Sequence, residues 1–229
     1  MEQLSGGFTL EISPGAFPLG TDSIALSGFA KLPRNAKILD LGSGCGTLGL
    51  LLCARHSQCA VTGVELDPFA HATALENIRR NGLEGRMHSI CADLTQIPQF
   101  IEPGSFSMCI SNPPYFSAGP ASKSLSQARR EDTCDLKSLL HSAAWALKYG
   151  GDLCMVYRPE RLAELFSLAS QMKLEPKRLC LVRHKPADPV SLVLVQCRKG
   201  AKPGLIWEEL HLYESDGSPS GAYRTLYNL

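Results

Sequence analysis

From residue 36 onward, short apolar segments alternate with longer amphipathic ones, and this alternation constrains the fold more than any other feature of the sequence. The segments 37–41, 60–66, 86–91 and 106–110 have the length and apolar content of buried strands. A helical pattern or a turn follows each of them. Strands and helices that alternate in this way predict parallel βαβ units, with helices covering both faces of one sheet.

The predicted helices lie at 23–31, with Thr21 or Asp22 as the N-cap, at 47–55, at 69–81, where Pro68 suits the first turn, and at 135–148, which ends at Gly150 and Gly151. A fifth strand at 152–157 precedes a helix at 159–172. The last apolar runs, 179–182 and 190–196, have no clear helix between them, so we expect them to pair antiparallel at one edge. The predicted fold is a Rossmann-like, seven-stranded, mostly parallel sheet with one antiparallel edge strand.

A polar residue occupies the same position in four successive βα units, at the point where the strand ends. These residues are Asp40, Glu65, Asp93 and Asn112. Ligands of open α/β sheets bind outside the carboxyl ends of the strands. The shared position therefore predicts one site at this edge of the sheet.

The loop after the first strand contains Gly42, Gly44 and Gly46, and Glu65 follows about 20 residues later. Glycines let a backbone approach a ligand closely, and a carboxylate at this spacing is typical of one that binds ribose hydroxyls. A dinucleotide loop would need glycine where Thr47 stands. Asp40 is also unfavourable beside a pyrophosphate, whereas it suits a ligand with an ammonium group. S-adenosylmethionine has an ammonium group, an adenosine and no phosphate.

The fourth strand leads into Asn112, Pro113, Pro114 and Tyr115. Two consecutive prolines make a stiff turn, which can also be a simple loop start. Held by such a turn, the side-chain oxygen of Asn112 and the carbonyl of Pro113 can accept hydrogen bonds from both hydrogens of a planar amine, while Tyr115 stacks on its ring. This arrangement suits methyl transfer to an amine by positioning, without a nucleophile or a metal.

Together these motifs resemble the class I S-adenosylmethionine-dependent methyltransferases, and the turn at Asn112 resembles the catalytic motif of members that methylate amino groups on planar systems. The similarity covers roughly residues 17 to 198. It implies that Glu65 binds the ribose hydroxyls, that Asp93 binds the adenine amine, and that the glycine loop binds the methionine part. The residues expected to contact the cofactor are Thr21, Asp22, Asp40, Gly42, Ser43, Gly44, Gly46, Glu65, Leu66, Asp93, Leu94 and Asn112. Asp67 is a weaker candidate, whose simpler role is to cap the helix at Pro68.

Within this class the chain is similar to the bacterial tRNA (valine) adenine-N6 methyltransferase family, whose target is an adenine beside the anticodon. The segments 17–22, 128–131 and 147–151 carry this resemblance. It implies that Thr21 and Asp22 help to close the cofactor pocket. It also implies that the loop with Lys123, Arg129 and Arg130 lies near the nucleic acid, although a solvated side chain is the simpler interpretation for each of these three. Cations that follow the later strands extend this predicted RNA-contacting set. The set comprises Lys123, Arg129, Arg130, Arg158, Arg183 and Lys185, with Arg161, Lys177 and Arg178 as possible extensions.

Three other functions remain open. Glutamine-N5 methyltransferases of release factors share the Asn-Pro-Pro-Tyr turn but carry an amino-terminal helical domain, whereas only 39 residues precede Asp40. Guanine-N2 rRNA methyltransferases tend to have Phe or Trp after the prolines and often a duplicated domain. A non-catalytic module that binds the cofactor or RNA is the third alternative, and the intact turn and glycine loop argue against it.

Composition and organisation limit the remaining possibilities. The formal net charge is +1, so a nucleic-acid partner has to be argued from local clusters. The nine cysteines include no C-x-x-C pair and indicate buried residues in a reducing cytoplasm, with no zinc site. No signal peptide or membrane span is expected. We expect an arm at 1–35 that covers the cofactor pocket, a methyltransferase domain at 36–200 and an extension at 201–229. The oligomeric state is left open.

Overall fold

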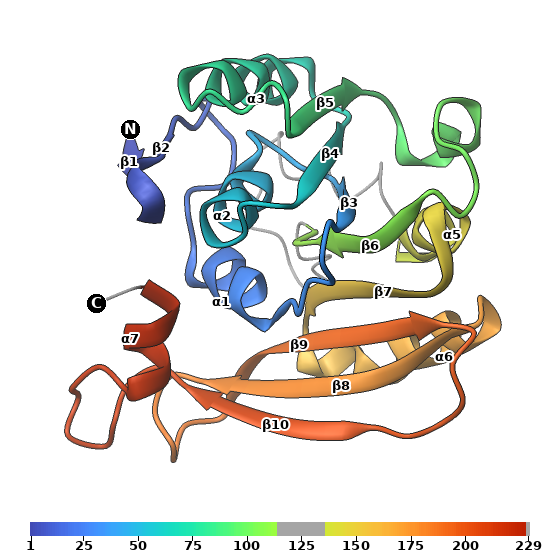
Figure 1. The fold of residues 1–229 in the computed structure, drawn as a ribbon. Coiled ribbons are helices and arrows are strands. Elements are labelled where there is room, and N and C mark those ends of the chain that lie inside the picture. The colour runs from blue at the N-terminus through green and yellow to red at the C-terminus, as the bar shows by residue number, and fades with distance from the viewer. Residues whose placement is uncertain (114–135, 228–229) are drawn as a thin grey trace.

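The computed structural model describes residues 1–113 and 136–227 and is built on one eight-stranded sheet (Figure 1). The strand order is β10-β8-β9-β7-β6-β3-β4-β5. The strands are β3 (Lys37–Leu41), β4 (Ala60–Glu65), β5 (Met87–Cys91), β6 (Phe106–Ser111), β7 (Leu147–Tyr157), β8 (Leu174–Arg183), β9 (Val190–Lys199) and β10 (Ile206–His211).

The sheet is parallel except for β9, which pairs antiparallel with both β7 and β8. The predicted Rossmann-like class is confirmed, as is the antiparallel pairing of the last two apolar runs. Two details of the prediction are corrected. Within the described residues the main sheet has eight strands, because β10 from the C-terminal segment pairs with β8 in parallel. The antiparallel strand β9 is internal, because β8 pairs on its outer side and β10 lies beyond β8.

Helices cover both faces of this sheet, and each face has its own hydrophobic core (Figure 1). Within β3, Ile38 belongs to one core and Leu39 to the other, as the alternating direction of side chains along a strand requires. The helices of the first core are α1 (Thr21–Phe29), α2 (Thr47–Arg55) and α3 (Pro68–Arg80), and those of the second are α5 (Leu136–Ala146), α6 (Leu162–Gln171) and the 3-10 turn η2 (Leu94–Gln99).

Four predicted helices can be compared with the structure. The helix at 47–55 is confirmed as α2, and Asp67 caps α3 by accepting a hydrogen bond from the Phe69 N–H at 2.9 Å. The expected cap of α1 is wrong, because Gly20 is the N-cap and Thr21 already lies in the first turn. Helix α5 is shorter than expected, because Leu147 pairs with Phe106 and so begins β7.

The two ends of the chain lie on the same side of the molecule (Figure 1). At the N-terminus, β1 (Glu2–Gln3), the 3-10 turn η1 (Ser5–Gly7) and β2 (Thr9–Leu10) form a small hairpin. Near the C-terminus, α7 (Gly221–Tyr227) packs against α1, and any side chain at Gly28 would overlap Leu226. Another 3-10 turn, η3 (Pro159–Arg161), precedes α6.

Two further observations bear on the sequence predictions. The cysteines that the structure describes are buried, apart from the exposed Cys91, as small apolar residues in a core are. Among the described helices, none has the length and apolar character that a membrane span requires.

Candidate active site

A cavity of about 570 Å³ opens at the carboxyl ends of β3, β4 and β6. This volume is in the range of sites for small molecules and cofactors. Its walls come from the segment before α1, the glycine loop, the loop after β4, and the ends of β5 and β6. The lining residues include Ala16, Phe17, Pro18, Ser23, Gly42, Ser43, Gly44, Glu65, Leu66, Asp67, Phe69, Asp93, Leu94, Asn112 and Pro113.

The loop between β3 and α2 has three backbone positions whose conformation favours glycine. Gly42, Gly44 and Gly46 have φ values of 73°, 55° and 84°, which side chains rarely tolerate. The N–H groups of Gly42 and Ser43 both donate to the carbonyl of Val64, at 3.0 and 3.1 Å. The loop therefore lies against the end of β4, with Gly46 as the N-cap of α2.

Glu65 connects this loop to the next one. Its Oε2 accepts from the Gly44 N–H at 2.7 Å, and its Oε1 accepts from the Asp67 N–H at 2.9 Å. Because each carboxylate oxygen can accept more than one hydrogen bond, Glu65 keeps capacity for hydroxyl donors of a ligand. Gly44 and Asp67 thus fix the orientation of the carboxylate at the cavity wall.

Asp40 and Ser43 carry buried oxygens that the protein leaves without hydrogen bonds. Both carboxyl oxygens of Asp40 and the Oγ of Ser43 lack a hydrogen-bond partner, and Asp40 is fully buried. Burial, and secondarily the charge of Glu65, raises the pKa of Asp40 to about 8. Ser43 lines the cavity, whereas Asp40 is not among its lining residues. A group that supplies hydrogen-bonding partners at this wall is therefore favoured.

Asp93 follows β5 and also has a local role. Its Oδ1 accepts from both the backbone N–H and the hydroxyl of Thr95, each at 2.8 Å, and so caps η2. Leu94 is buried beside it. The carboxylate is thereby held at the cavity wall.

Asn112 is oriented by a residue that the sequence analysis did not single out. Its Nδ2 donates to the Oγ of Ser23 in α1 at 3.0 Å. This bond uses one donor of the amide nitrogen and leaves Oδ1, the acceptor of the side chain, available to a ligand. Both Asn112 and the buried Pro113 line the cavity.

The structure brings most of the predicted cofactor residues to this cavity, but not all of them. Gly42, Ser43, Gly44, Glu65, Leu66, Asp93, Leu94 and Asn112 line it, whereas Thr21, Asp22, Asp40 and Gly46 do not. Thr21 instead hydrogen-bonds to the Tyr227 hydroxyl at 3.1 Å. Burial raises the pKa of Asp22, opposed by its own backbone N–H and by Arg158. Five predicted residues fall outside the described part of the chain: Pro114, Tyr115, Lys123, Arg129 and Arg130.

The described cations of the predicted RNA-contacting set lie along the edge of the sheet that carries the cavity. Arg158 is exposed directly after β7. Arg183 ends β8 and donates to the Asp188 carbonyl at 2.6 Å, and Lys185 follows it. Four strand spacings of about 4.8 Å separate β8 from β3, so these two side chains lie roughly 19 Å along the edge from the glycine loop.

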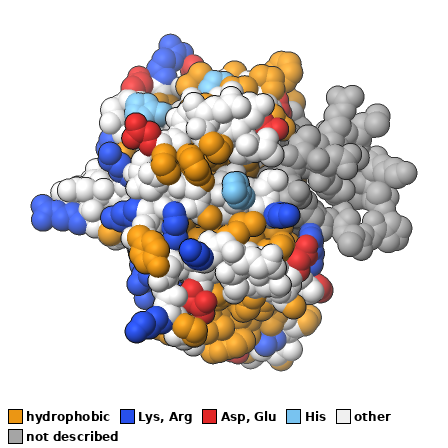
Figure 2. Space-filling view, turned by 90° about the vertical axis from the view of Figure 1, so that its right-hand side faces the viewer, with side chains coloured by type: hydrophobic (Ala, Val, Ile, Leu, Met, Phe, Trp, Pro, Cys, Tyr) orange, Lys and Arg blue, Asp and Glu red, His pale blue; other side chains and the backbone are white. Residues whose placement is uncertain are grey.

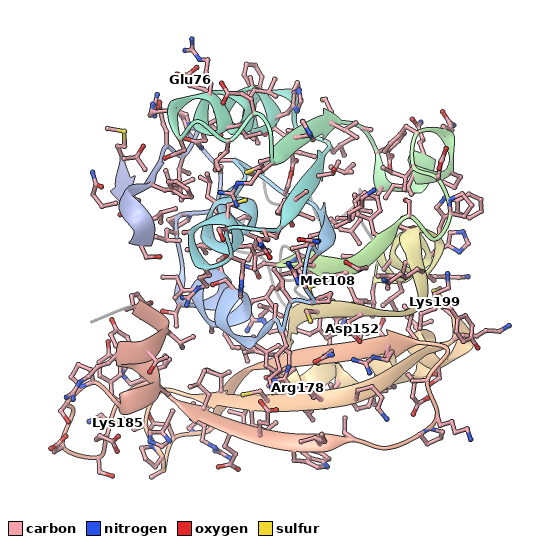
Figure 3. All side chains as sticks on the ribbon, viewed as in Figure 1. Glu76, Met108, Asp152, Arg178, Lys185 and Lys199 are labelled. Carbon is pink, nitrogen blue, oxygen red and sulfur yellow. The ribbon has the colours of Figure 1, made fainter. Side chains whose placement is uncertain are left out.

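Two of the possible extensions of this set are wrong. Arg178 is buried, pairs with Glu208 at 2.8 Å and donates to the Phe29 carbonyl at 3.0 Å, so it stabilises the packing of α1 on the sheet. Lys177 lies near the start of β8, at the opposite end of the sheet. Figure 3 shows these two ends by the positions of Lys185 and Lys199. Figure 2 shows that Lys and Arg side chains are also common on the face away from Lys185.

Several cavity residues had little signal in the sequence. Ala16, Phe17 and Pro18 come from the segment before α1, and Phe69 comes from the first turn of α3. Phe17 and Phe69 are 50% and 79% exposed, which gives the cavity an apolar rim. The sequence contained one indication that Phe17 and Pro18 belong to the site. They lie shortly before the helix predicted at 23–31, and the family resemblance begins at residue 17.

Comparison with known proteins identifies related sequences and folds. The family model for the methyltransferase small domain matches residues 19–173. The tRNA1(Val) (adenine(37)-N6)-methyltransferase of Musicola paradisiaca is 30% identical, over 88% of this chain and 84% of the relative. The enzymes of the same description from Vibrio vulnificus and Bacteroides fragilis are 29% and 30% identical, over 94% and 82% of this chain and 88% and 80% of the relatives.

Solved structures show the same fold. A crystal structure of a predicted O-methyltransferase from Agrobacterium tumefaciens superposes with a TM-score of 0.75 at 20% identity, covering 91% of this chain and 96% of that chain. A geranyl diphosphate methyltransferase in complex with SAM superposes with a TM-score of 0.59 at 14% identity, covering 77% and 84%.

The contact between the glycine loop and β4 predicts a compensating pair of substitutions. A Cβ at Gly63 in β4 would lie 2.6 Å from Ser43 Oγ and 2.8 Å from Ser43 Cβ. We expect Gly63→Ala to lower the free energy of unfolding by about 1–3 kcal/mol, the usual cost of overpacking. The double variant Ser43→Gly with Gly63→Ala removes both overlapping atoms and should recover most of this loss in denaturant unfolding. Equal destabilisation of the single and double variants would contradict the contact.

The raised pKa of Asp40 predicts a pH dependence of stability. The unfolded carboxyl ionises near 3.8, whereas the folded one stays protonated up to about pH 8. Between these values the folded state binds the additional proton, so the free energy of unfolding should fall as the pH rises from about 4 to about 8. Asp40→Asn cannot ionise and should lack this decrease. Denaturant unfolding of both proteins across the range provides the measurement, and parallel curves would contradict the assignment.

Proposed function

The chain belongs to the methyltransferase small domain family, and we propose that it transfers the methyl group of S-adenosylmethionine to N6 of an adenine beside the anticodon of a tRNA in the cytoplasm. The relatives support the reaction and the substrate, since those compared above are described as adenine(37)-N6-methyltransferases of tRNA1(Val) and align with 82% or more of this chain. The orientation of Asn112 carries the proposal on the structural side.

The residues at the glycine loop fit S-adenosylmethionine, the methyl donor of this family. The unpartnered hydroxyl of Ser43 and the oriented carboxylate of Glu65 offer hydrogen-bonding positions at the cavity wall. In our proposal Glu65 accepts from the ribose hydroxyls, Asp93 from the adenine amine, and the glycine loop holds the methionine part. When bound, the cofactor supplies an electrophilic methyl group.

Asn112 and Pro113 form the acceptor half of the proposed site. The Nδ2 of Asn112 donates to Ser23, which holds the carboxamide in place, and in our proposal Oδ1 faces the incoming amine. Oδ1 and the carbonyl of Pro113 then accept one hydrogen bond each from the two amine hydrogens. An exocyclic amine is a weak nucleophile because its lone pair is delocalised into the ring. Holding both hydrogens directs the lone pair out of the ring plane, so that orientation takes the place of a strong base.

The edge of the sheet beyond this acceptor half supports a polyanionic partner. In our proposal the exposed Arg158 lies nearest to the reacting amine, and Arg183 and Lys185 contact phosphates farther along the same edge. A substrate that reaches all three has to extend well beyond one nucleotide. This requirement favours a folded RNA over a free nucleoside.

Mass spectrometry of nucleosides tests the substrate. Bulk tRNA and rRNA from cells with and without the gene are hydrolysed and compared, and loss of N6-methyladenosine from one tRNA is the expected result. Loss of N2-methylguanosine from rRNA, or of N5-methylglutamine from a protein digest, would replace the proposed acceptor with one of the rival ones. Unchanged modification in all three samples would contradict a catalytic role.

Substitution of Asn112 tests the proposed chemistry. Asn112→Ala removes the acceptor oxygen, so we expect transfer to fall below detection, while the affinity for S-adenosylhomocysteine stays within about tenfold, or about 1.4 kcal/mol. Asn112→Asp keeps acceptor oxygens in the same place and should retain measurable transfer. Calorimetric titration and a methyl-transfer assay give the two readouts. Full activity of Asn112→Ala would eliminate the mechanism.

A further inference from the structure

Asn77 in α3 and Asn81, the C-cap of α3, bind residues 9–18. We call this part of the N-terminal segment the arm. Asn81 accepts from the Thr9 N–H and donates to the Thr9 carbonyl, both at 2.8 Å. Asn77 makes the same pair of bonds to Glu11, at 2.9 and 2.8 Å. Positions i and i+4 of a helix lie about as far apart as positions i and i+2 of an extended chain. The two carboxamides therefore bind the arm as a neighbouring strand does.

Asn77 makes one bond to the glycine loop that Asn81 does not make. Its Nδ2 also donates to the carbonyl of Cys45, in the glycine loop, at 3.0 Å. Asn81 uses its additional bond on the carbonyl of Asn77, within α3. Asn77 is fully buried, so its carboxamide is shielded from water. One side chain thus connects the arm, α3 and the glycine loop.

The arm makes a second contact with the same loop. The N–H and the hydroxyl of Ser13 both lie 3.4 Å from the sulfur of Cys45. Three residues later the arm reaches the cavity, where Ala16, Phe17 and Pro18 form part of the wall. The position of this wall relative to the glycine loop is therefore set at Cys45.

We propose that Asn77 is a positioning residue for the methyl donor. It does not line the cavity, and it acts by holding the arm and the glycine loop in the relative positions that S-adenosylmethionine requires. Loss of the Asn77 side chain separates two walls of the donor site while leaving every cavity residue in the sequence. The proposal rests on the donor half of the proposed function and is independent of the acceptor.

The comparison of Asn77→Ala with Asn81→Ala tests this role. Both variants lose two hydrogen bonds to the arm, but only Asn77→Ala loses the bond to the glycine loop. We expect Asn77→Ala to weaken binding of S-adenosylhomocysteine by about tenfold or more, equivalent to about 1.4 kcal/mol. Asn81→Ala should weaken it by less than about threefold. In a transfer assay the effect should appear in KM for S-adenosylmethionine, with kcat close to that of the unchanged protein.

A second pair of variants avoids the buried site, in case Asn77→Ala does not fold. Glu11→Pro removes the N–H that donates to Asn77 and leaves the bond between Asn77 and Cys45 intact. Glu11→Ala is the matched control, since it keeps this N–H and removes the side chain that pairs with Arg80 at 2.7 Å. Weaker binding of S-adenosylhomocysteine by Glu11→Pro, but not by Glu11→Ala, is the expected result.

The outcomes separate the two proposals. If the unchanged protein binds no S-adenosylhomocysteine, the proposed function fails at its donor half. If the unchanged protein binds it and Asn77→Ala binds equally well, or if Asn77→Ala and Asn81→Ala weaken binding equally, the positioning role of Asn77 is overturned. Equal affinities of Glu11→Pro and Glu11→Ala would likewise overturn the contribution of the arm.

Discussion

Three backbone N–H groups of the glycine loop bind the end of β4, and the rest of the site depends on this contact. Gly42 and Ser43 donate to the Val64 carbonyl, and Gly44 donates to the Glu65 side chain. The same interaction thus places the loop, orients a carboxylate and brings β3 and β4 together at the cavity. Gly63 makes the approach possible, because any larger residue would meet Ser43. The donor site is therefore rigid for reasons that lie in the backbone.

The features with a regular period were predictable from the sequence. Strand β3 and helix α2 have the predicted bounds, because an apolar run and a glycine loop mark their ends. The line of polar residues from Asp40 to Asn112 was also predictable, since parallel strands bring their carboxyl ends to one edge. The cap of α1 and the place of β9 were not. A cap depends on local backbone geometry, and the place of β9 depends on its pairing with both β7 and β8.

The contacts between distant segments had no signal in the sequence. Ser23 orients Asn112 across 89 residues, and Asn77 binds Glu11 across 66. Ser and Asn are common on helices, so the sequence does not distinguish Ser23 or Asn77 from a solvated residue. Only the packing of α1 and α3 against the sheet gives these side chains their partners. The same reason explains why Arg178 was taken for a surface cation, since its burial depends on α1 and β10.

The packing of α7 against α1 has a consequence for biosynthesis. Leu226 accepts a hydrogen bond from Arg55, and Tyr227 bonds to Thr21, so a helix that is synthesised after every strand of the described sheet supports the helix that carries Ser23. A ribosome adds about 5–20 residues per second, and the N-terminal parts of a chain are the first that can fold during synthesis. The sheet from β3 to β7 can form while translation continues, but α1 obtains these neighbours only when α7 has left the ribosome. Truncation at a late codon therefore leaves the central sheet intact and the acceptor side of the site without its support.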